Sequence, residues 1–263
     1  MRQRSLLPLL VVLKMLRYQA AALVAASIIG GGPWTFSADA ATFTVEPTQI
    51  VFSNRTNSVL LTLRNESTET LRFELSVFKW GQSPSGEMLL EATEDIVFFP
   101  ALLTLAPGES RRVRVGSATE FDKVEKSYRI FVEELPPLER QGNGVRVLTK
   151  MGIPIFLRPA KEVASANLTN LGQKSGKVFF TLSNDGTVHF VPKEIRVRGF
   201  AGSAAAVDNQ IDGWYILAGG RREFDLAFPE AECSRITSVT VDVQFGSESL
   251  QERLQTPNGV CSR

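Results

Sequence analysis

The sequence has few of the residues on which common enzyme and metal sites depend. Its 263 residues include one histidine, His189, and two cysteines, Cys233 and Cys261. One histidine cannot form an HExxH zinc site, and it allows a Ser-His-Asp triad only if that same residue serves. Two cysteines are too few for a cysteine metal cluster. His189 lies in an alternating stretch, which favours a structural role, so we predict no catalytic residue, no metal and no enzyme.

Cofactor and nucleic-acid signals are also missing. Gly30–Gly32 lies in the first 40 residues and Gly219-Gly220 is typical of a hairpin turn, so neither is a phosphate-binding loop. The formal net charge is +1, and without residues 1–40, which hold four basic residues and one acidic one, it becomes 1 − 3 = −2. Nucleic-acid-binding proteins carry a strong basic excess. We therefore expect no cofactor and no nucleic-acid partner.

No apolar run is long enough to span a bilayer. Ala20–Ile29 offers ten residues, whereas a helix needs about 20 to cross the hydrocarbon core. Four basic residues precede this run, and Ala38-Asp39-Ala40 places small residues two apart, which is typical of an export signal with its cleavage site. The alternative is a membrane anchor. We predict that residues 1–40 are a signal peptide that is removed, with no stable membrane insertion afterwards.

Export would bring the two cysteines into an oxidising compartment. Cys233 and Cys261 could then form a disulfide, and closing a loop of 261 − 233 = 28 residues would contribute on the order of 3 kcal/mol by loop entropy. The alternative is a pair of free, buried thiols. Both possibilities stay open at this point, and the disulfide is the candidate.

Short alternating apolar runs with turn residues between them fill the rest of the chain. The first half predicts about seven strands and almost no helix, which favours an immunoglobulin-like sandwich. These strands are Phe43–Ser53 with Pro47 as a kink or an edge position, Val59–Leu63, Leu71–Trp80, Ile96–Leu105, Arg112–Val115, Tyr128–Leu135 and Gly144–Pro159.

The pattern starts again after Pro159 and predicts a second sandwich. Its strands are Val163–Leu171, Lys177–Ser183, Val188–Val197, Trp214–Leu217, Phe224–Phe228 and Thr237–Phe245. The predicted fold class is all-β, with two immunoglobulin-like β-sandwich domains at 41–158 and 159–263. Because only a few residues about Pro159 link them, we expect a fixed angle between the two.

The most informative stretch is Gly144–Pro159. Its odd-numbered positions are apolar except for Thr149, which is the period of one long strand. Gly152 and Pro154 interrupt the other face, and a proline has no N–H for a ladder, so we expect a sheet edge. Long apolar edges aggregate unless something covers them. Either this protein covers the strand itself or a partner does.

An exposed edge strand can bind another chain by adding a strand to it, with alternate side chains filling pockets. The candidate partner-binding side chains are Val145, Val147, Thr149 and Met151. Each large apolar member would contribute roughly 1.5–3 kcal/mol before association costs. The alternative is that they are ordinary core of the first domain, as we expect for Ile153–Leu157.

Four stretches together resemble one protein family. They are Thr44–Phe52 (TVEPTQIVF), Leu105–Val115 (LAPGESRRVRV), Tyr128–Pro137 (YRIFVEELPP) and Ile153–Pro159 (IPIFLRP). At this spacing the chain resembles the periplasmic chaperones of the chaperone–usher pathway of pilus assembly. The YRIFVEELPP and GIPIF spellings resemble the branch of archaic pili and spore-coat-U-type fibres more than that of type 1 and P pili.

The resemblance implies donor-strand complementation in the periplasm. The chaperone would lend its long strand to pilus or spore-coat-U-like subunits that lack their last strand, and deliver them to an outer-membrane usher. A secreted structural fibre subunit or adhesin with immunoglobulin-like domains is the alternative. It would need either a donor extension at its mature N-terminus or a groove of its own, and Ala41–Phe43 leads straight into the first strand, which favours the chaperone.

The family also clamps the subunit's C-terminal carboxylate with two basic residues, and here the resemblance breaks. The corresponding positions are Gln49 and Pro154, which carry no charge. An antiparallel hairpin would place Arg129 roughly opposite Pro154, and Lys150 lies on the polar face of the same strand. Arg129 and Lys150 are therefore the candidate carboxylate anchors, with arginine favoured because its guanidinium binds a carboxylate in a bidentate way.

An interdomain salt bridge is the last implied site. The resemblance assigns it to Glu125 and Arg158. The family's third member, an acid in the second domain, falls near Gln244, so Asp242 would have to replace it. Such a bridge would fix the interdomain angle more than it would add stability, because desolvating charges offsets much of their attraction.

Overall fold

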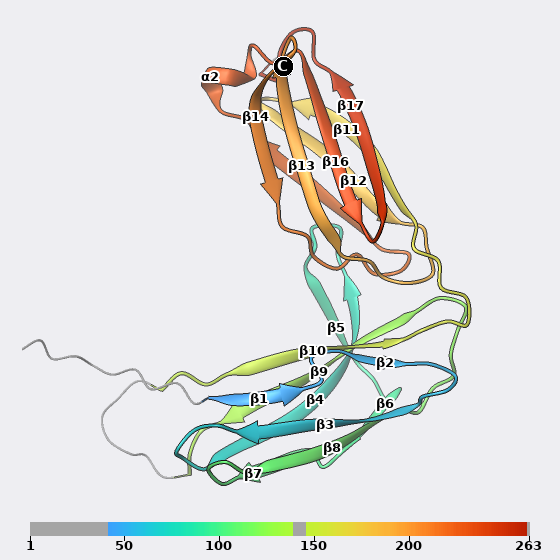
Figure 1. Cartoon of the computed structure of the whole chain (residues 1–263), viewed down its shortest axis with the longest axis vertical. Coiled ribbons are helices and arrows are strands. Elements are labelled where there is room, and N and C mark those ends of the chain that lie inside the picture. Colours follow the sequence, from blue (N-terminus) through green and yellow to red (C-terminus); the bar gives the residue numbers. More distant parts are fainter. Residues whose placement is uncertain (1–41, 139–145, 262–263) are drawn as a thin grey trace, which may run out of the picture. The chain divides into compact units, whose positions relative to one another are not determined.

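The computed structural model describes residues 42–138 and 146–261 (Figure 1). These residues form two β-sandwiches, each made of two sheets. The all-β, two-sandwich prediction is confirmed, whereas the predicted signal peptide lies outside the described residues. Within the described ranges no helix has the length and hydropathy of a membrane span.

The first sandwich contains ten strands in two sheets. One sheet has the order β1 (Phe43–Glu46), β3 (Ser58–Asn65), β8 (Ser110–Ser117), β6 (Ile96–Phe99). The other has the order β2 (Ile50–Phe52), β10 (Lys150–Leu157), β9 (Lys126–Leu135), β4 (Leu71–Gln82), β5 (Met88–Ala92), and β7 (Leu102–Leu105) also pairs with β4.

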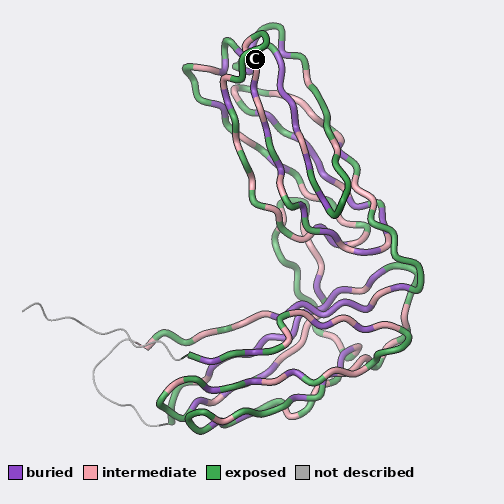
Figure 2. The backbone as a smooth tube through the Cα atoms, in the orientation of Figure 1, coloured by how far each residue is buried: buried purple, intermediate pink, exposed green. Residues whose placement is uncertain are grey.

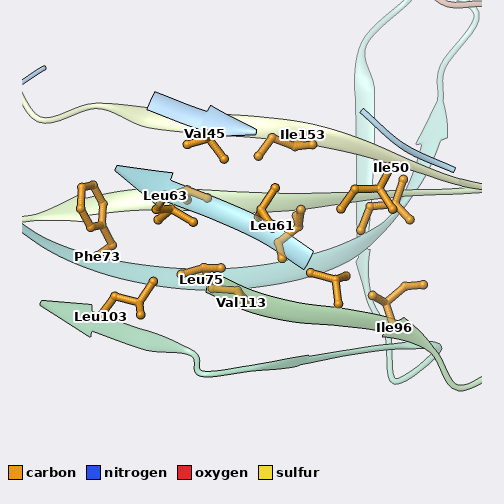
Figure 3. Packing of buried hydrophobic residues seen from close by; sticks show 14 of the residues in the cluster. Val45, Ile50, Leu61, Leu63, Phe73, Leu75, Ile96, Leu103, Val113 and Ile153 are labelled. Atoms are coloured by element: carbon orange, nitrogen blue, oxygen red, sulfur yellow. The ribbon is translucent and has the colours of Figure 1, made fainter. Parts of the chain in front are cut away.

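Buried residues recur along the strands of both sheets (Figure 2), and their side chains meet in one core (Figure 3). Leu61 and Leu63 of β3 are fully buried, as is Phe73 of β4, and Ile153 of β10 belongs to the same cluster. Fully burying such a side chain stabilises the fold by roughly 1.5–3 kcal/mol. The period-two pattern of the sequence therefore corresponds to real burial.

Two prolines divide what the sequence presents as single strands. The predicted strand Phe43–Ser53 becomes β1 and β2, which lie in different sheets, so the kink at Pro47 is confirmed. The prediction of one strand over Ile96–Leu105 is wrong, because β6 and β7 are separate and pair with different neighbours on either side of Pro100. A proline has no N–H to continue a ladder. β5 was not predicted, and all of its residues are exposed.

The second sandwich contains seven strands and one short helix, α2 (Glu230–Cys233). One sheet has the order β11 (Ala166–Lys174), β12 (Lys177–Asn184), β15 (Arg221–Ala227). The other has the order β14 (Ala204–Ile211), β13 (Pro192–Ala201), β16 (Ser238–Phe245), β17 (Glu248–Gln255).

Two strand predictions in this half need correction, and two strands were missed. The strand predicted at Trp214–Leu217 is wrong, because only an isolated bridge joins Ile216 to Phe190. The strand predicted to begin at Val188 begins at Pro192 instead. β14 and β17 were not predicted, since β17 is largely exposed and its sequence is mostly polar.

A disulfide joins α2 to the last described residues of this sandwich. Cys233 lies at the end of α2 and is bonded to Cys261, with the two Cα atoms 5.2 Å apart. The backbone N–H of Val260 also donates to the carbonyl of Cys233 at 2.7 Å. The last described residues are therefore held against α2 by a covalent bond and a hydrogen bond.

Candidate functional site: an open strand edge

β10 is only partly covered on the side away from β9. It pairs with β9 in antiparallel fashion along its whole length, whereas its parallel pairing with β2 covers Ile155–Leu157 alone (Figure 1). The predicted edge position is therefore correct for Lys150–Pro154 and wrong for Ile155–Leu157.

β10 begins later than the predicted strand. Its regular ladder starts at Lys150, and Val145 lies outside the described residues. Just before it, the N–H of Glu134 donates to the carbonyl of Thr149 at 2.9 Å, but the N–H of Thr149 donates to the Glu134 carboxylate at 3.3 Å. A side chain thus replaces one ladder acceptor there, which accounts for the end of the regular pairing.

The uncovered part of β10 presents free backbone groups. Hydrogen-bonding directions alternate along an antiparallel pair, so the groups of Met151 and Ile153 face β9, as that of Thr149 does. Those of Lys150 and Gly152 face the other side, where the N–H of Arg158 reaches β2 further along. Within the described residues, Lys150 and Gly152 have no backbone partner on that side.

The candidate partner-binding side chains differ in exposure. Val147 is 52% exposed, Thr149 is partly buried, and Met151 packs partly against the core of its own sandwich. From Ile153 to Leu157 the residues are buried. The expectation of first-domain core is confirmed for Ile153, Ile155 and Leu157, whereas Phe156 packs in a separate cluster with Trp80 and Leu217. Lending of Val145–Met151 to a partner stays a prediction.

The hairpin of β9 and β10 places Arg129 directly opposite Pro154, as expected from the sequence. Directly opposed residues of a sheet lie on the same face, so Arg129 shares the face of Lys150 and Gly152, away from the core. The carbon of its guanidinium lies 4.1 Å from the centre of the Trp80 ring and 5.6 Å from that of Trp214. A cation over an indole face is an attractive arrangement.

Arg129 is a buried cation without an acidic partner in the described part of the chain. Only 7% of the surface of Arg129 is exposed, and its Nε has no hydrogen-bond partner among the described residues. Burial lowers the pKa of Arg129 by desolvating the charge, while the neighbouring Tyr215 acts in the opposite direction. Such a charge is costly to bury and therefore favours an anion from outside.

Gly152 keeps the strand edge open beside this guanidinium. A Cβ at this position would lie 3.4 Å from Nη1 of Arg129 and 2.8 Å from Cε1 of Phe131. Any side chain on Gly152 would thus occupy the space between the backbone of β10 and the cation. The glycine that interrupts the sequence pattern is what leaves this space available.

Lys150, the second anchor candidate, is less suited to bind an anion. Its Nζ lies 2.7 Å from the carboxylate of Glu133, with which it forms an ion pair, and about half of its side chain is exposed. An exposed ion pair is worth little, because solvent screens both charges. Lys150 therefore already has a counter-charge, whereas Arg129 has none among residues 42–138 and 146–261.

Glu125 and Arg158 approach each other as the resemblance implied, but another residue binds Glu125 more closely. Arg158 Nε lies 3.9 Å from Glu125, whose side chain is fully buried. Glu125 Oε1 lies 2.6 Å from His189 Nδ1 and accepts the backbone N–H of His189 at 3.0 Å. The His189 ring stacks on Phe156, with ring centres 3.7 Å apart.

The second-sandwich partner of Glu125 is therefore a histidine and not an acid. The suggested replacement, Asp242, is wrong, because its carboxylate instead pairs with Arg198 at 2.7 Å. The alternating sequence around His189 predicts a structural role for this residue but does not indicate Glu125 as its partner. The only available signal was that it is the single histidine of the chain.

A sandwich whose last strand is half covered, with a buried cation beside the free edge, defines a protein suited to bind another chain by strand addition. Residues 42–162 match the family model of the PapD N-terminal domain of pili and flagellar-assembly chaperones. The first sandwich is therefore similar to this chaperone domain, and through it the chain is similar to the pilus-assembly chaperones. No curated protein matches the sequence significantly.

Solved chaperone structures share the fold. CsuC, in its pre-assembly complex with the tip adhesion subunit CsuE from archaic Csu pili of Acinetobacter baumannii, is 18% identical, with a TM-score of 0.56 over 81% of this chain and 98% of that one. The class 5 fimbriae chaperone CfaA is 18% identical (TM-score 0.54; 81% and 98%). The E. coli chaperone DraB is 16% identical (TM-score 0.53; 82% and 98%). These similarities show the two-sandwich fold, and the archaic branch stays a prediction.

Proposed function

We propose that this protein is a periplasmic chaperone that binds incomplete immunoglobulin-like pilus or fibre subunits by donor-strand complementation. The observation that carries the proposal is the uncovered edge of β10 at Lys150–Pro154, next to the buried cation of Arg129. The family model that residues 42–162 match describes pili and flagellar-assembly chaperones, which supports this function and favours no enzyme activity.

The open edge would bind the subunit in two ways. The free N–H and C=O groups of Lys150 and Gly152 would continue the ladder into the partner's strand. Val147, Thr149 and Met151, together with Val145, would fill successive pockets of the incomplete sandwich. Val147 is the strongest candidate within the described residues, because it is exposed in the free protein.

Arg129 would anchor the subunit's C-terminal carboxylate, with Lys150 as the second candidate. A guanidinium that is already desolvated gains more from an anion than a solvated one, since charges interact more strongly where the dielectric is low. Its two parallel donors also suit a carboxylate. Arg129→Ala should reduce subunit binding and fibre yield, whereas Lys150→Gln should have a smaller effect. Unchanged fibre yield for Arg129→Ala would exclude this anchor.

Several further assignments rest on the family and on the sequence. We propose that residues 1–40 direct export and are removed, that an outer-membrane usher receives the loaded complex, and that the clients belong to the archaic or spore-coat-U-like branch. N-terminal sequencing of the protein recovered from the periplasm tests the first. Pull-down of a chaperone–subunit complex by an isolated usher tests the second.

The alternative, a structural fibre subunit or adhesin, is not favoured, because the first sandwich matches a chaperone family. Co-expression with a subunit that lacks its last strand separates the two functions. A chaperone should give a soluble one-to-one complex, and a fibre subunit should give polymers. If the client remains insoluble in the presence of this protein, the chaperone function is wrong for that client class.

A further inference from the structure

Two tryptophans flank the cation that we assign to the client's carboxylate, and they differ in exposure. Trp80, at the end of β4, is 4% exposed, whereas Trp214, carried by the second sandwich, is 44% exposed. Both indole rings lie over the Arg129 guanidinium. An exposed tryptophan beside a buried cation offers an apolar surface next to an anion-binding group.

The loop that carries Trp214 is held in place by defined contacts. Gln82, the last residue of β4, donates from Nε2 to the carbonyl of Tyr215 at 2.8 Å. The Tyr215 ring meets Trp80 edge to face, with centres 5.2 Å apart, and Trp214 lies perpendicular to Tyr215 at 5.5 Å. The first sandwich therefore fixes the loop, and Trp214 is presented beside Arg129 in a defined orientation.

We propose that Trp80, Arg129 and Trp214 form a subsite for the C-terminal residue of the client. Arg129 binds the terminal carboxylate, Trp80 supports the guanidinium from its buried side, and Trp214 contacts the side chain of that last residue. The subsite thereby favours chains that end in an aromatic or large aliphatic residue. This inference rests on the proposed chaperone function, and it gives the second sandwich a direct part in client selection.

The probes for the test are small acids that mimic a chain end. N-acetyl-phenylalanine carries both the carboxylate and the aromatic side chain, N-acetyl-phenylalaninamide lacks the charge, and N-acetylglycine lacks the side chain. In the chain without residues 1–40, Trp80 and Trp214 are the only tryptophans, so their indole N–H resonances report binding directly. N-acetyl-phenylalanine should shift both resonances saturably, and the amide should bind at least about tenfold more weakly.

Trp214→Ala separates the two parts of the subsite, and because Trp214 is exposed, this variant should fold. It should keep the preference for the acid over the amide but lose the preference for N-acetyl-phenylalanine over N-acetylglycine, which we expect to be about 3- to 10-fold in the natural chain. Equal binding of acid and amide, or an unchanged side-chain preference in Trp214→Ala, would overturn the subsite.

Co-expression with a client distinguishes failure of the subsite from failure of the function. If Trp214→Ala solubilises clients with aromatic and with glycine ends equally well, and the natural chain prefers the aromatic end, the subsite is supported. If neither protein shows a preference while Arg129→Ala loses both clients, the anchor function stands and the side-chain subsite is wrong.

Discussion

Replacing Arg129 by methionine should impair client binding without destabilising the free protein. In the free protein the guanidinium is desolvated, and no acidic side chain of the described ranges pairs with it. An uncompensated buried charge costs several kcal/mol after relaxation. Its contacts with the indole of Trp80 return about 0.5–2 kcal/mol.

Methionine removes the charge and keeps most of the contact. Its flexible thioether fills a similar volume and packs favourably on an aromatic ring. The free energy of unfolding should therefore stay the same or rise by up to about 2 kcal/mol. A buried charge that lowers the free energy of unfolding indicates a functional site, because function and stability often place opposite demands on the residues of such a site.

The assay has two arms. Urea unfolding of the free chain, followed by tryptophan fluorescence, measures stability, and client solubility on co-expression measures function. Arg129→Lys is the matched control, since it keeps the charge but loses the bidentate geometry, and it should rescue the client only in part. If Arg129→Met lowers the free energy of unfolding by more than about 2 kcal/mol and still rescues the client, Arg129 is structural and the reasoning is wrong.

Four further changes test the rest of the site. Val147→Asp should leave the fold intact, because the side chain is exposed, yet abolish client rescue by placing a charge in a client pocket; folding and rescue together would contradict the lent strand. Gly152→Val should reduce client binding more than urea stability, since its side chain fills the space beside the guanidinium. Glu125→Gln should lower the free energy of unfolding by about 1–3 kcal/mol, measured in urea. Replacing Cys233 and Cys261 by serine should cost about 3 kcal/mol, and equal melting temperatures with and without reductant would refute this.

The sequence predicts those strands that bury one face in a core. In β3, β9 and β16 the residues of the core cluster lie at every second position, as do Leu61 and Leu63 in β3, so the apolar period shows in the sequence. β5 could not be found in this way, because none of its residues is buried. Its strand conformation comes from pairing with β4, and such pairing leaves no periodic mark in the sequence.

The sequence predicts the part of the site that lies within one hairpin, but it does not predict the contacts between the two sandwiches. The position of Arg129 opposite Pro154 followed from counting residues across a turn. The contact of Glu125 with His189 joins residues 64 positions apart in different sandwiches, and no local pattern predicts it. The same holds for Trp214, which sequence reasoning assigned to a strand and the structure places in a loop beside Arg129.

The short strand β2 limits where any chain that pairs with the free side of β10 can end. β2 occupies the flank of β10 from Ile155 onward, so a strand that aligns with the free flank must terminate before that point. In the proposed binding mode its final residue would lie next to Pro154, which pairs with Arg129, and the pairing of the earlier residues would follow from this end point. The position of its C-terminal end alone would therefore set the alignment of each bound chain, whatever its sequence.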